Sequence, residues 1–396
     1  MKKIVAFLFF YTICNFSLSA QSKLSDVFFL DTIVPVVGIS SDLLYQNKLK
    51  ISIVDDDIFL SYQKDKSRLH LSLINKGKVK KQKVINIPRK YICKDAYTLI
   101  CTTISKDYIL FGYTDFFYIF KRKGHGIKFY AKIINNHAYD SYEIYGNQVF
   151  CCYSYNEAGG NKRVKISKFD IIMKKIIKEV ELEFKYMEYS HFTPRHWFAI
   201  GDEKLFLTNT AIYEFSVFDN NIDSVGNVKR KLDNWVEASD SVIKRIRDEN
   251  YGARKTLNVL SKANNNEISR VEGIWCLNDS VILVRYFMKN ISGEFKNRFF
   301  DIYKTKNDSI QLIYSSLSDV SFPLNMQEKV TKNNSQLWTW NFYNEIGSSK
   351  IVLVKPMAPI EYLGKTLLES KKDEEEFYKV HEPIVGIWVY KLKMGY

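Results

Sequence analysis

The chain has 396 residues, of which 46% are hydrophobic and 26% are charged, and its formal net charge at pH 7 is +14. A chain of this length and composition buries a large core, which excludes a disordered or collagen-like protein. The basic residues are scattered rather than clustered, so charge is a weak clue and nucleic acid is not an expected partner.

The first segment has the features of a secretory signal peptide. Lys2 and Lys3 are basic, residues 4–16 are almost entirely apolar, and small residues follow at Ser19 and Ala20, which is the usual order in such leaders. The apolar run is shorter than the roughly 20 residues of a membrane span, and the residues before Cys14 lack a lipoprotein pattern. We predict that residues 1–20 are removed and that the protein is exported to the periplasm, the cell surface or the medium, with no later transmembrane segment.

The cysteines exclude a complete disulfide framework. Removal of the leader leaves an odd number without a CxxC motif, so at least one thiol is expected to be free. We predict neither a metal site nor a cofactor. The five remaining cysteines are Cys93, Cys101, Cys151, Cys152 and Cys276.

One unit recurs six times along the chain: a polar turn pair, three apolar residues, a small or variable residue, and usually a tyrosine. Each copy follows a short apolar strand and precedes two more, so each unit has four predicted strands. In the loosest copy, Leu337–Asn341 is the second strand and Ile351–Val354 the third. The six copies end at Tyr62, Tyr113, Tyr153, Asn209, Tyr286 and Asn341.

Ordered four-strand units of this kind predict an all-β, six-bladed β-propeller of antiparallel blades over residues 21–396, as a single domain. A β-sandwich is the alternative that short strands and polar turns alone do not exclude. Val27–Leu30 and Ile384–Tyr390 flank the repeats. Either segment could complete a shared blade, and together they could form a partial seventh.

Two segments interrupt the strand pattern with helical spacing. Residues 237–265 are predicted to form a helical insertion between blades four and five, with Ser239-Asp240 as its N-cap. A weaker helical signal covers residues 366–377.

Loop lengths point to one face of the propeller. Links between blades emerge on the same face as the loops between second and third strands, and the long ones flank blade four at residues 185–196 and 229–273. Long internal loops at 156–162 and 288–297 belong to blades three and five. We therefore predict a ligand site on the face around blades three to five.

The candidate ligand-binding residues come from this sector. His191 and His196 share a link, but two histidines without a third ligand do not make a metal site. Arg285 stands where the other copies carry uncharged residues, so it either reaches the channel or pairs with a carboxylate of a neighbouring blade. The candidates are Arg195, His196, Trp197, Glu157, Arg163 and Arg285.

Sequence motifs of several enzyme classes are absent, including GxSxG, HExxH, the Walker loop and the dinucleotide glycine pattern. The first hypothesis is a binding module for a protein, peptide or glycan. The second is a carbohydrate-active hydrolase or lyase at the mouth of the channel, because two carboxylates are enough for such chemistry. The third is a scaffold without a small-molecule site. Whether the protein is an enzyme stays open.

The leader, the composition rich in Lys, Asn, Ile and Tyr, and the repeat of turn pair and aromatic strand together resemble the secreted six-bladed β-propeller proteins of Bacteroidetes. The resemblance covers most of the mature chain. It implies the fold and an exported location, and it brings no catalytic residues.

Overall fold

A computed structural model describes most of the strands and their turns. No helix in this described part is long and apolar enough to cross a membrane. Residues 1–20, 366–377 and, apart from Ser241, 237–265 lie outside it, so the leader and both helical segments stay predictions. The described residues are 24–40, 43, 48–93, 99–123, 126–139, 141–156, 162–184, 198–201, 203–209, 212–236, 241, 269–278, 280–288, 298–306, 309–318, 343–347, 349–357 and 384–393.

The described strands form six sheets of four antiparallel strands each. Blade one has β2 (Lys50–Val54), β3 (Asp57–Asp65), β4 (Arg68–Asn75) and β5 (Lys78–Asn86). Blade two has β6 (Cys101–Ile104), β7 (Tyr108–Gly112), β8 (Phe116–Lys123) and β9 (Gly126–Ile134). Blade three has β10 (Ser141–Tyr145), β11 (Gln148–Asn156), β12 (Lys162–Asp170) and β13 (Lys175–Phe184).

The second half continues the series. Blade four has β14 (Phe198–Gly201), β15 (Lys204–Asn209), β16 (Glu214–Asp219) and β17 (Ser224–Lys229). Blade five has β18 (Arg270–Asn278), β19 (Val281–Phe287), β20 (Arg298–Lys306) and β21 (Ser309–Ser318). Blade six has β22 (Tyr343–Gly347), β23 (Lys350–Met357), β24 (Ile384–Leu392) and, outermost, β1 (Phe28–Ser40). A short helix, α2 (Leu24–Val27), precedes β1, and a 3-10 turn, η1 (Arg89–Tyr91), follows β5.

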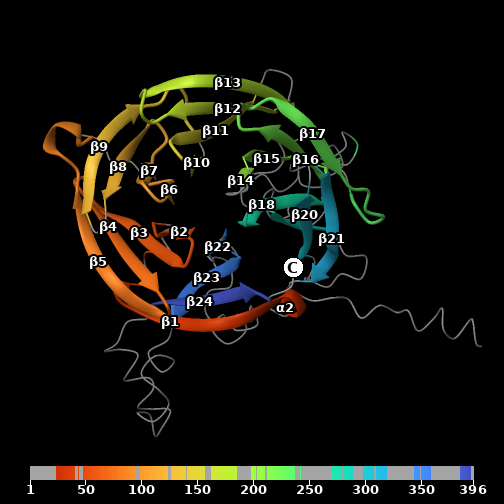
Figure 1. The fold of residues 1–396 in the computed structure, drawn as a ribbon, viewed down its shortest axis with the longest axis horizontal. Helices are drawn as coiled ribbons and strands as arrows, with labels where there is room; N and C mark the ends of the chain where they lie inside the picture. Colours follow the sequence, from red (N-terminus) through yellow and green to blue (C-terminus); the bar gives the residue numbers. More distant parts are fainter. Residues whose placement is uncertain are drawn as a thin grey trace, which may run out of the picture.

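The six sheets are arranged as the blades of a propeller around a central axis (Figure 1). Each inner strand contacts the inner strands of both neighbouring blades. The buried hydrophobic residues fall into six clusters, and each cluster fills the junction between two adjacent blades. The predicted six-bladed propeller is therefore confirmed, and the sandwich alternative is wrong.

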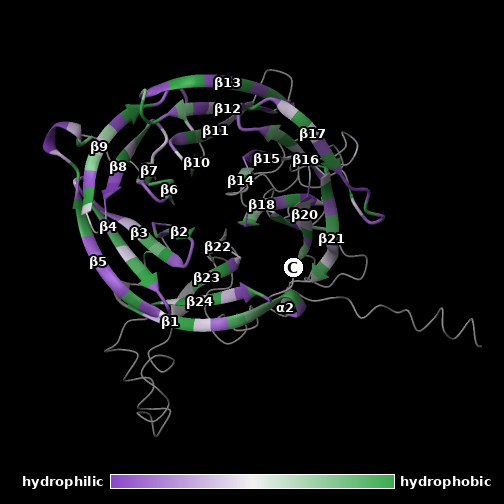
Figure 2. Ribbon diagram, viewed as in Figure 1, coloured by the Kyte–Doolittle hydropathy of each residue, from purple (hydrophilic) through white to green (hydrophobic). Residues whose placement is uncertain are grey.

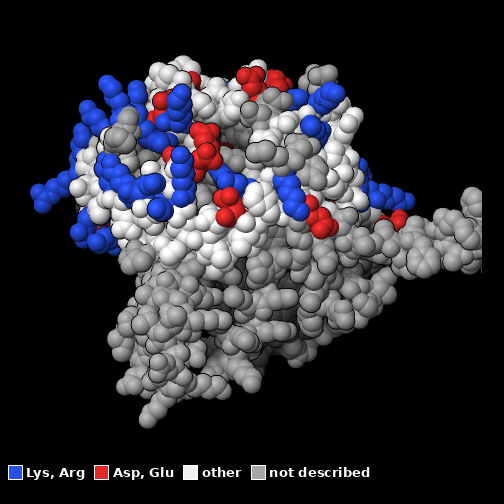
Figure 3. Space-filling model, turned by 60° about the horizontal axis from the view of Figure 1, so that its bottom comes forward, with Lys and Arg blue, Asp and Glu red and all other residues white. Residues whose placement is uncertain are grey.

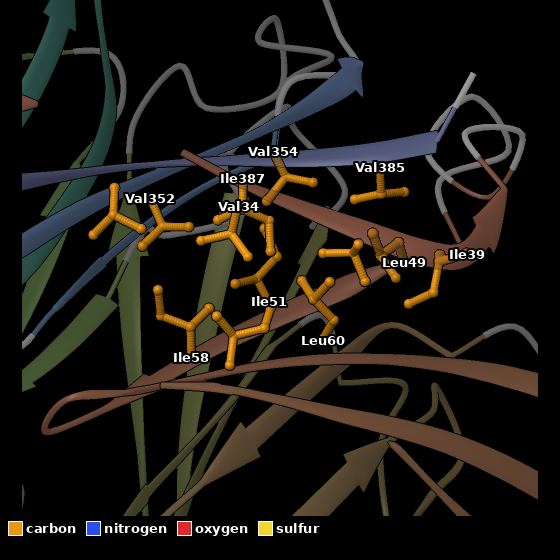
Figure 4. Close-up of a cluster of buried hydrophobic side chains, with 13 residues drawn as sticks. Val34, Ile39, Leu49, Ile51, Ile58, Leu60, Val352, Val354, Val385 and Ile387 are labelled. Carbon is orange, nitrogen blue, oxygen red and sulfur yellow. The ribbon is translucent and has the colours of Figure 1, made fainter. Parts of the chain in front are cut away.

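Both ends of the chain lie in blade six, whose strand order is β1-β24-β23-β22. Strand β1 pairs antiparallel with β24, with Val34 opposite Ile387. The two end segments therefore complete the sixth blade and form no partial seventh. Figure 4 shows how residues from β1, β23 and β24 meet the apolar side chains of blade one in the cluster that closes the ring.

The predicted strand assignment in the sixth copy of the repeat is wrong. Ile351–Val354 lies in β23, which is the second strand of blade six because it pairs with β22 on one side and β24 on the other. The expected third strand is therefore the second, and the third strand is β24. Leu337–Asn341 lies outside the described residues.

The outer, fourth strand of every blade has one extra residue, a bulge, at the same position in its pairing. This position is opposite the C-terminal part of the third strand. Such a bulge bends a strand and increases its twist, which suits strands that wrap the outside of the ring. Blade six has the bulge on β1, so the N-terminal strand takes a full role in its blade. The extra residues are Lys80, Tyr130, Ile177, Val225, Ile313 and Asp31.

The two rims of the ring differ in their connections. On one, the short-turn rim, turns of two to four residues join first to second strands in every blade and third to fourth strands in blades one to five. On the other, the long-connection rim, links reach much greater lengths, including 185–197 and 230–269. Two more long links, 319–342 and 358–383, leave or lie within blades five and six. The elaborated sector thus extends beyond blades three to five into blade six.

Polarity follows this architecture. Figure 2 shows that β5, the outer strand of blade one, is largely hydrophilic, whereas β7, the second strand of blade two, is mainly apolar. Strand β7 is also buried along its whole length. None of the five cysteines of the predicted mature chain forms a disulfide in the structure, so the apolar clusters hold the blades together without disulfides.

The closing blade offers a direct test of this packing. Ile387 of β24 is fully buried (0% exposed), whereas Ile33 of β1 is 43% exposed on the outside of the same sheet. We expect Ile387→Ala to lower the free energy of unfolding by about 2–5 kcal/mol, because it leaves a cavity between blades. Ile33→Ala, the matched control, should cost under about 1 kcal/mol. Urea unfolding followed by fluorescence measures both, and equal losses would contradict the proposed closure.

Candidate binding surface on the long-connection rim

Four of the six candidate residues lie outside the described part of the chain: Glu157, Arg195, His196 and Trp197. Their roles stay predictions. The other two, Arg163 and Arg285, are described, and each belongs to a different group of charged and aromatic side chains near the long-connection rim.

Arg163 lies in a regular cross-strand pattern on blade three. Two rows of three residues run across β11, β12 and β13: Tyr153 opposite Lys165 opposite Glu181, and Tyr155 opposite Arg163 opposite Glu183. Because side chains alternate along a strand, both rows lie on one face of the sheet. We call these six residues the blade-three array.

The array extends the packed face of the blade toward the long-connection rim. Tyr153 packs against the cluster between blades two and three. Tyr155 is the second-to-last residue of β11, and Arg163 is the second residue of β12, so both lie at the end of the blade near the long-connection rim. The array is thus partly exposed, since the Arg163 and Glu183 side chains are 29% and 40% accessible.

Three aromatic rings form a stack along the array. His137, in the link from blade two, stacks on Tyr153 with ring centres 4.9 Å apart and planes at 4°. Tyr153 stacks on Tyr155 at 5.1 Å and 16°. Tyr155 is the last ring of this stack in the described part of the chain. Its hydroxyl is hydrogen-bonded to Glu181, which raises the pKa of the phenol, so Tyr155 stays a donor at neutral pH.

The charged residues of the array brace one another. Arg163 lies between two carboxylates, with Nη1 3.5 Å from Glu181 Oε1 and Nη2 3.9 Å from Glu183 Oε2. Lys165 Nζ is 3.9 Å from Glu181 Oε2. Glu179, the next acidic residue on the same face of β13, accepts a hydrogen bond from Ser167 at 2.7 Å. Three carboxylates therefore face two cations, and the surface is net acidic.

Arg285 belongs to a second group on blade five. Its Nε lies 3.3 Å from Glu272 Oε2, and Arg270 Nη2 lies 3.0 Å from Glu272 Oε1. The guanidinium of Arg285 is over the Trp275 ring, 5.3 Å from its centre. The prediction of an ion pair is right in kind, but the partner is on the neighbouring strand of the same blade. Glu272 is only 9% accessible, so this group is mainly structural.

Trp275 depends on a glycine. A Cβ on Gly273 would come within 2.5 Å of the Trp275 ring, so the ring occupies the space that any other residue would need. Gly273 is also directly opposite Arg285 in the register. The glycine thus allows the indole and the guanidinium to stack at the inner side of blade five.

A buried carboxylate joins blades four and five. Asp301 is fully buried and forms an ion pair with Arg230, which follows β17. It also accepts hydrogen bonds from the Tyr213 hydroxyl at 2.5 Å and the Ser316 backbone N–H at 2.7 Å. Burial raises the pKa of Tyr213, so this phenol stays protonated and donates. Because its partners occupy the carboxylate, Asp301 is a structural group.

Glu143, on the inner strand β10, is a carboxylic acid whose surroundings bring its pKa close to neutral pH. Desolvation raises its pKa from 4.5 to about 7, although a hydrogen bond from Thr103 on the inner strand of blade two, at 3.4 Å, acts in the opposite direction. Glu345 occupies the same register position on β22, since each lies opposite the second residue of the apolar run in the next strand. Blades three and six are on opposite sides of the ring (Figure 1).

The sequence prediction included Arg163 but missed the rest of the array. A signal was present: Glu179, Glu181 and Glu183 alternate along one predicted strand, and Arg163 and Lys165 alternate along the preceding one. Alternation at period two places each set on one face. The stacking partner His137 comes from a link outside the blade, which no local pattern predicts.

Comparisons with known proteins give structural likenesses only. No family model matches the chain, and no curated protein matches it. A protein of Bacteroides fragilis described as a candidate exported protein has 13% identity and a TM-score of 0.48, over 94% of this chain and 98% of that one. A member of the DUF4221 family from Bacteroides vulgatus has 10% identity and a TM-score of 0.47, over 92% and 98%.

A third similarity is partial. Apo AztD from Citrobacter koseri has 13% identity and a TM-score of 0.32, and the match covers 46% of this chain and 47% of AztD. The chain thus spans about half the length of that protein. None of these values assigns a family, and the propeller fold rests on the strand pairing of the chain itself.

The buried pair at Asp301 should matter far more for stability than an exposed pair. We expect Asp301→Asn to lower the free energy of unfolding by about 3–5 kcal/mol, because Arg230 is left without its counter-charge in a mostly buried place. The control is Asp223→Asn, which breaks the pair with Lys178 at a carboxylate that is 67% accessible and should cost under about 1 kcal/mol. Chemical denaturation of both variants checks this, and similar losses would contradict it.

The raised pKa of Glu143 predicts a pH-dependent penalty on folding. Below about pH 4.5 both folded and unfolded states hold the proton, so the penalty is absent; it grows as pH rises to about 7 and then stays constant. Glu143→Gln should therefore unfold like the wild type at pH 4, below both pKa values. At pH 8 it should be more stable by about 1–2 kcal/mol, a figure discounted because the side chain is only partly buried. Melting temperatures of both proteins across this pH range test the prediction. A difference between variant and wild type that does not change with pH would refute the raised pKa of Glu143.

Proposed function

We propose that this chain is an exported binding module that recognises a glycan with the blade-three array. The observation that supports the proposal is the combination, on one partly exposed face near the long-connection rim, of a stacked row of rings with braced carboxylates and a guanidinium. Propellers commonly place ligand sites among the loops of one face. Export rests on the predicted leader.

The ring stack suits the flat side of a sugar. Stacked rings hold one another in a fixed orientation, so a further flat group can add to the end of the row at little cost in conformational entropy. Tyr155 is partly exposed and is the last described ring of the row. A pyranose ring presents an apolar face of C–H groups that can lie against such a ring.

The charged groups suit sugar hydroxyls. A carboxylate accepts two or more hydrogen bonds, and a guanidinium donates in fixed directions. Arg163 already lies within 4 Å of both Glu181 and Glu183, so neighbouring hydroxyl groups would meet acceptors and a donor together. The net acidic balance of the surface disfavours a strongly anionic ligand.

An enzyme is the second candidate, because Glu143 has a pKa of about 7. A general acid works best with a pKa near the working pH, and Glu345 occupies the corresponding position across the ring. Carbohydrate hydrolysis or elimination would appear as release of new reducing ends from a glycan. Loss of that release in Glu143→Gln, with glycan binding retained, would favour this candidate over a pure binding module.

The test of the binding module starts with a glycan array probed with the mature chain, followed by calorimetry on the glycans that bind. Tyr155→Ala should weaken the affinity about five- to tenfold or more, because it removes a stacking contact of about 1 kcal/mol or more. Tyr130→Ala is the matched control, since Tyr130 is a partly buried tyrosine on the outer strand of blade two. It should leave the Kd unchanged.

Two results would count against the proposal. An unchanged Kd in Tyr155→Ala would remove the blade-three array from the site, even if a glycan binds elsewhere. Binding of displayed peptides at the array, with no glycan bound, would keep the site and refute the ligand class.

A further inference from the structure

Most of the positive charge belongs to two blades. Residues 50–134, which form blades one and two, contain 18 Lys or Arg and 7 Asp or Glu, whereas the whole chain has a formal net charge of +14. The expectation that the basic residues are scattered therefore fails at the level of blades. Figure 3 shows Lys and Arg side chains gathered on the side of the molecule that blades one and two form.

Six exposed lysines define what we call the basic wall. They lie on the outer strand of blade one and on the two outer strands of blade two. None of the six has an ion-pair partner in the described part of the chain. They are Lys78, Lys80, Lys81, Lys121, Lys123 and Lys128.

The strand register places several of these charges next to one another. Lys121 of β8 is directly opposite Lys128 of β9. Lys80 is the bulged residue of β5 and is followed by Lys81, which is back in register with Leu73. Like charges in directly opposite positions destabilise a sheet. An anionic ligand would relieve this repulsion, so the wall is poised for one.

Protection of sheet edges does not account for the wall. Lysines on an outer strand prevent edge-to-edge pairing, and such protection would apply to every blade. Yet β17 has one lysine, and β21 and β1 have none. On β13 the lysines are followed by Glu179, Glu181 and Glu183, which cancel them. The excess is specific to blades one and two.

We infer that the basic wall binds a linear, carboxylate-bearing polysaccharide. Charge complementarity calls for a polyanion, and the wall is a convex arc of outer strands (Figure 1), which a flexible chain can follow but a flat bilayer can touch only along a strip. The nearby aromatic residues of β9 are engaged: Phe129 stacks on Tyr91, and Tyr130 contacts Tyr108 edge-on. They are therefore not arranged as a platform for membrane insertion or for nucleic-acid bases.

This surface is separate from the blade-three array and opposite in sign. The array and the adjacent Glu179 together have three carboxylates and two cations, whereas the wall has only ammonium groups. The inference therefore holds or fails independently of the proposed glycan site.

The experiment compares three mature proteins for binding to alginate, a linear polyuronate, at several salt concentrations. The wall variant changes all six lysines of the basic wall to Gln. The control variant changes six other exposed lysines to Gln, so both lose the same charge. The control positions, on blades three to five and the link after β17, are Lys174, Lys175, Lys229, Lys231, Lys304 and Lys306.

We expect the wild type to bind alginate with an affinity that falls steeply with salt, as counterion release requires. The wall variant should bind about tenfold more weakly or worse and show a shallower salt slope, with the control within about twofold of the wild type. All the changed side chains are exposed, and equal melting temperatures of the three proteins confirm that folding is intact.

Three outcomes would overturn the inference: no binding of alginate by the wild type, equal losses in the wall and control variants, or tighter binding to vesicles that contain phosphatidylglycerol than to alginate. The last would assign the wall to a membrane surface.

Discussion

The pairing of β1 with β24 is the constraint on which the whole ring depends. A blade buries both faces against its neighbours, so an incomplete blade would leave two junctions open to water. Phe28, the first residue of β1, and Val27, just before it at the end of α2, belong to the cluster between blades five and six. Strand β1 also contributes Val34, Val36 and Ile39 to the cluster between blades six and one. One strand from the start of the described chain thus seals two of the six cores, and Lys350 adds a tie from blade six to the Asp55 carbonyl of blade one at 2.7 Å.

This closure also explains which parts of the fold the sequence predicts. The first five copies of the repeat have their second strands where expected, because Asn, Asp and Gly mark most of the tight turns and a buried apolar run follows each. In the sixth blade the sequence between β22 and β23 is a pair of serines, while Asn333-Asn334 has the usual composition of a turn pair farther upstream. Local turn chemistry therefore favours the wrong segment. The correct assignment depends on pairing between residues more than 300 positions apart, which no local pattern contains.

The candidate site also has parts that the sequence predicts and parts that depend on contacts between distant segments. Arg285 stands out in the sequence because a charge on a predicted second strand needs a partner, whereas Arg163 is a candidate because it belongs to the sector with long loops. The partner of Arg163 follows from register, because Glu183 is directly opposite it on the next strand. The partner of Arg285 does not, because Gly273 is opposite Arg285 and its ion-pair partner Glu272 is the residue before that glycine, at a register shift. The stacking of His137 on Tyr153 joins a link to a blade, so it depends on how two blades pack. Alternating charges were therefore within reach of sequence reasoning, whereas the aromatic row was not.

The contacts that stabilise the ring and the two proposed binding surfaces occupy different parts of blades one to three. The six clusters fill the middle of the junctions, and the fully buried Asp301 pair joins two blades where access is least. The array begins where the core between blades two and three ends, at Tyr153 and Tyr155, and the basic wall lies on outer strands whose bulges turn residues such as Lys80 to the outside. Side chains in both places are partly or fully exposed, so their charges can change with little effect on packing. Because the ring is held by contacts that exclude these positions, the rim and the wall can present opposite charges on one rigid body and bind different ligands together.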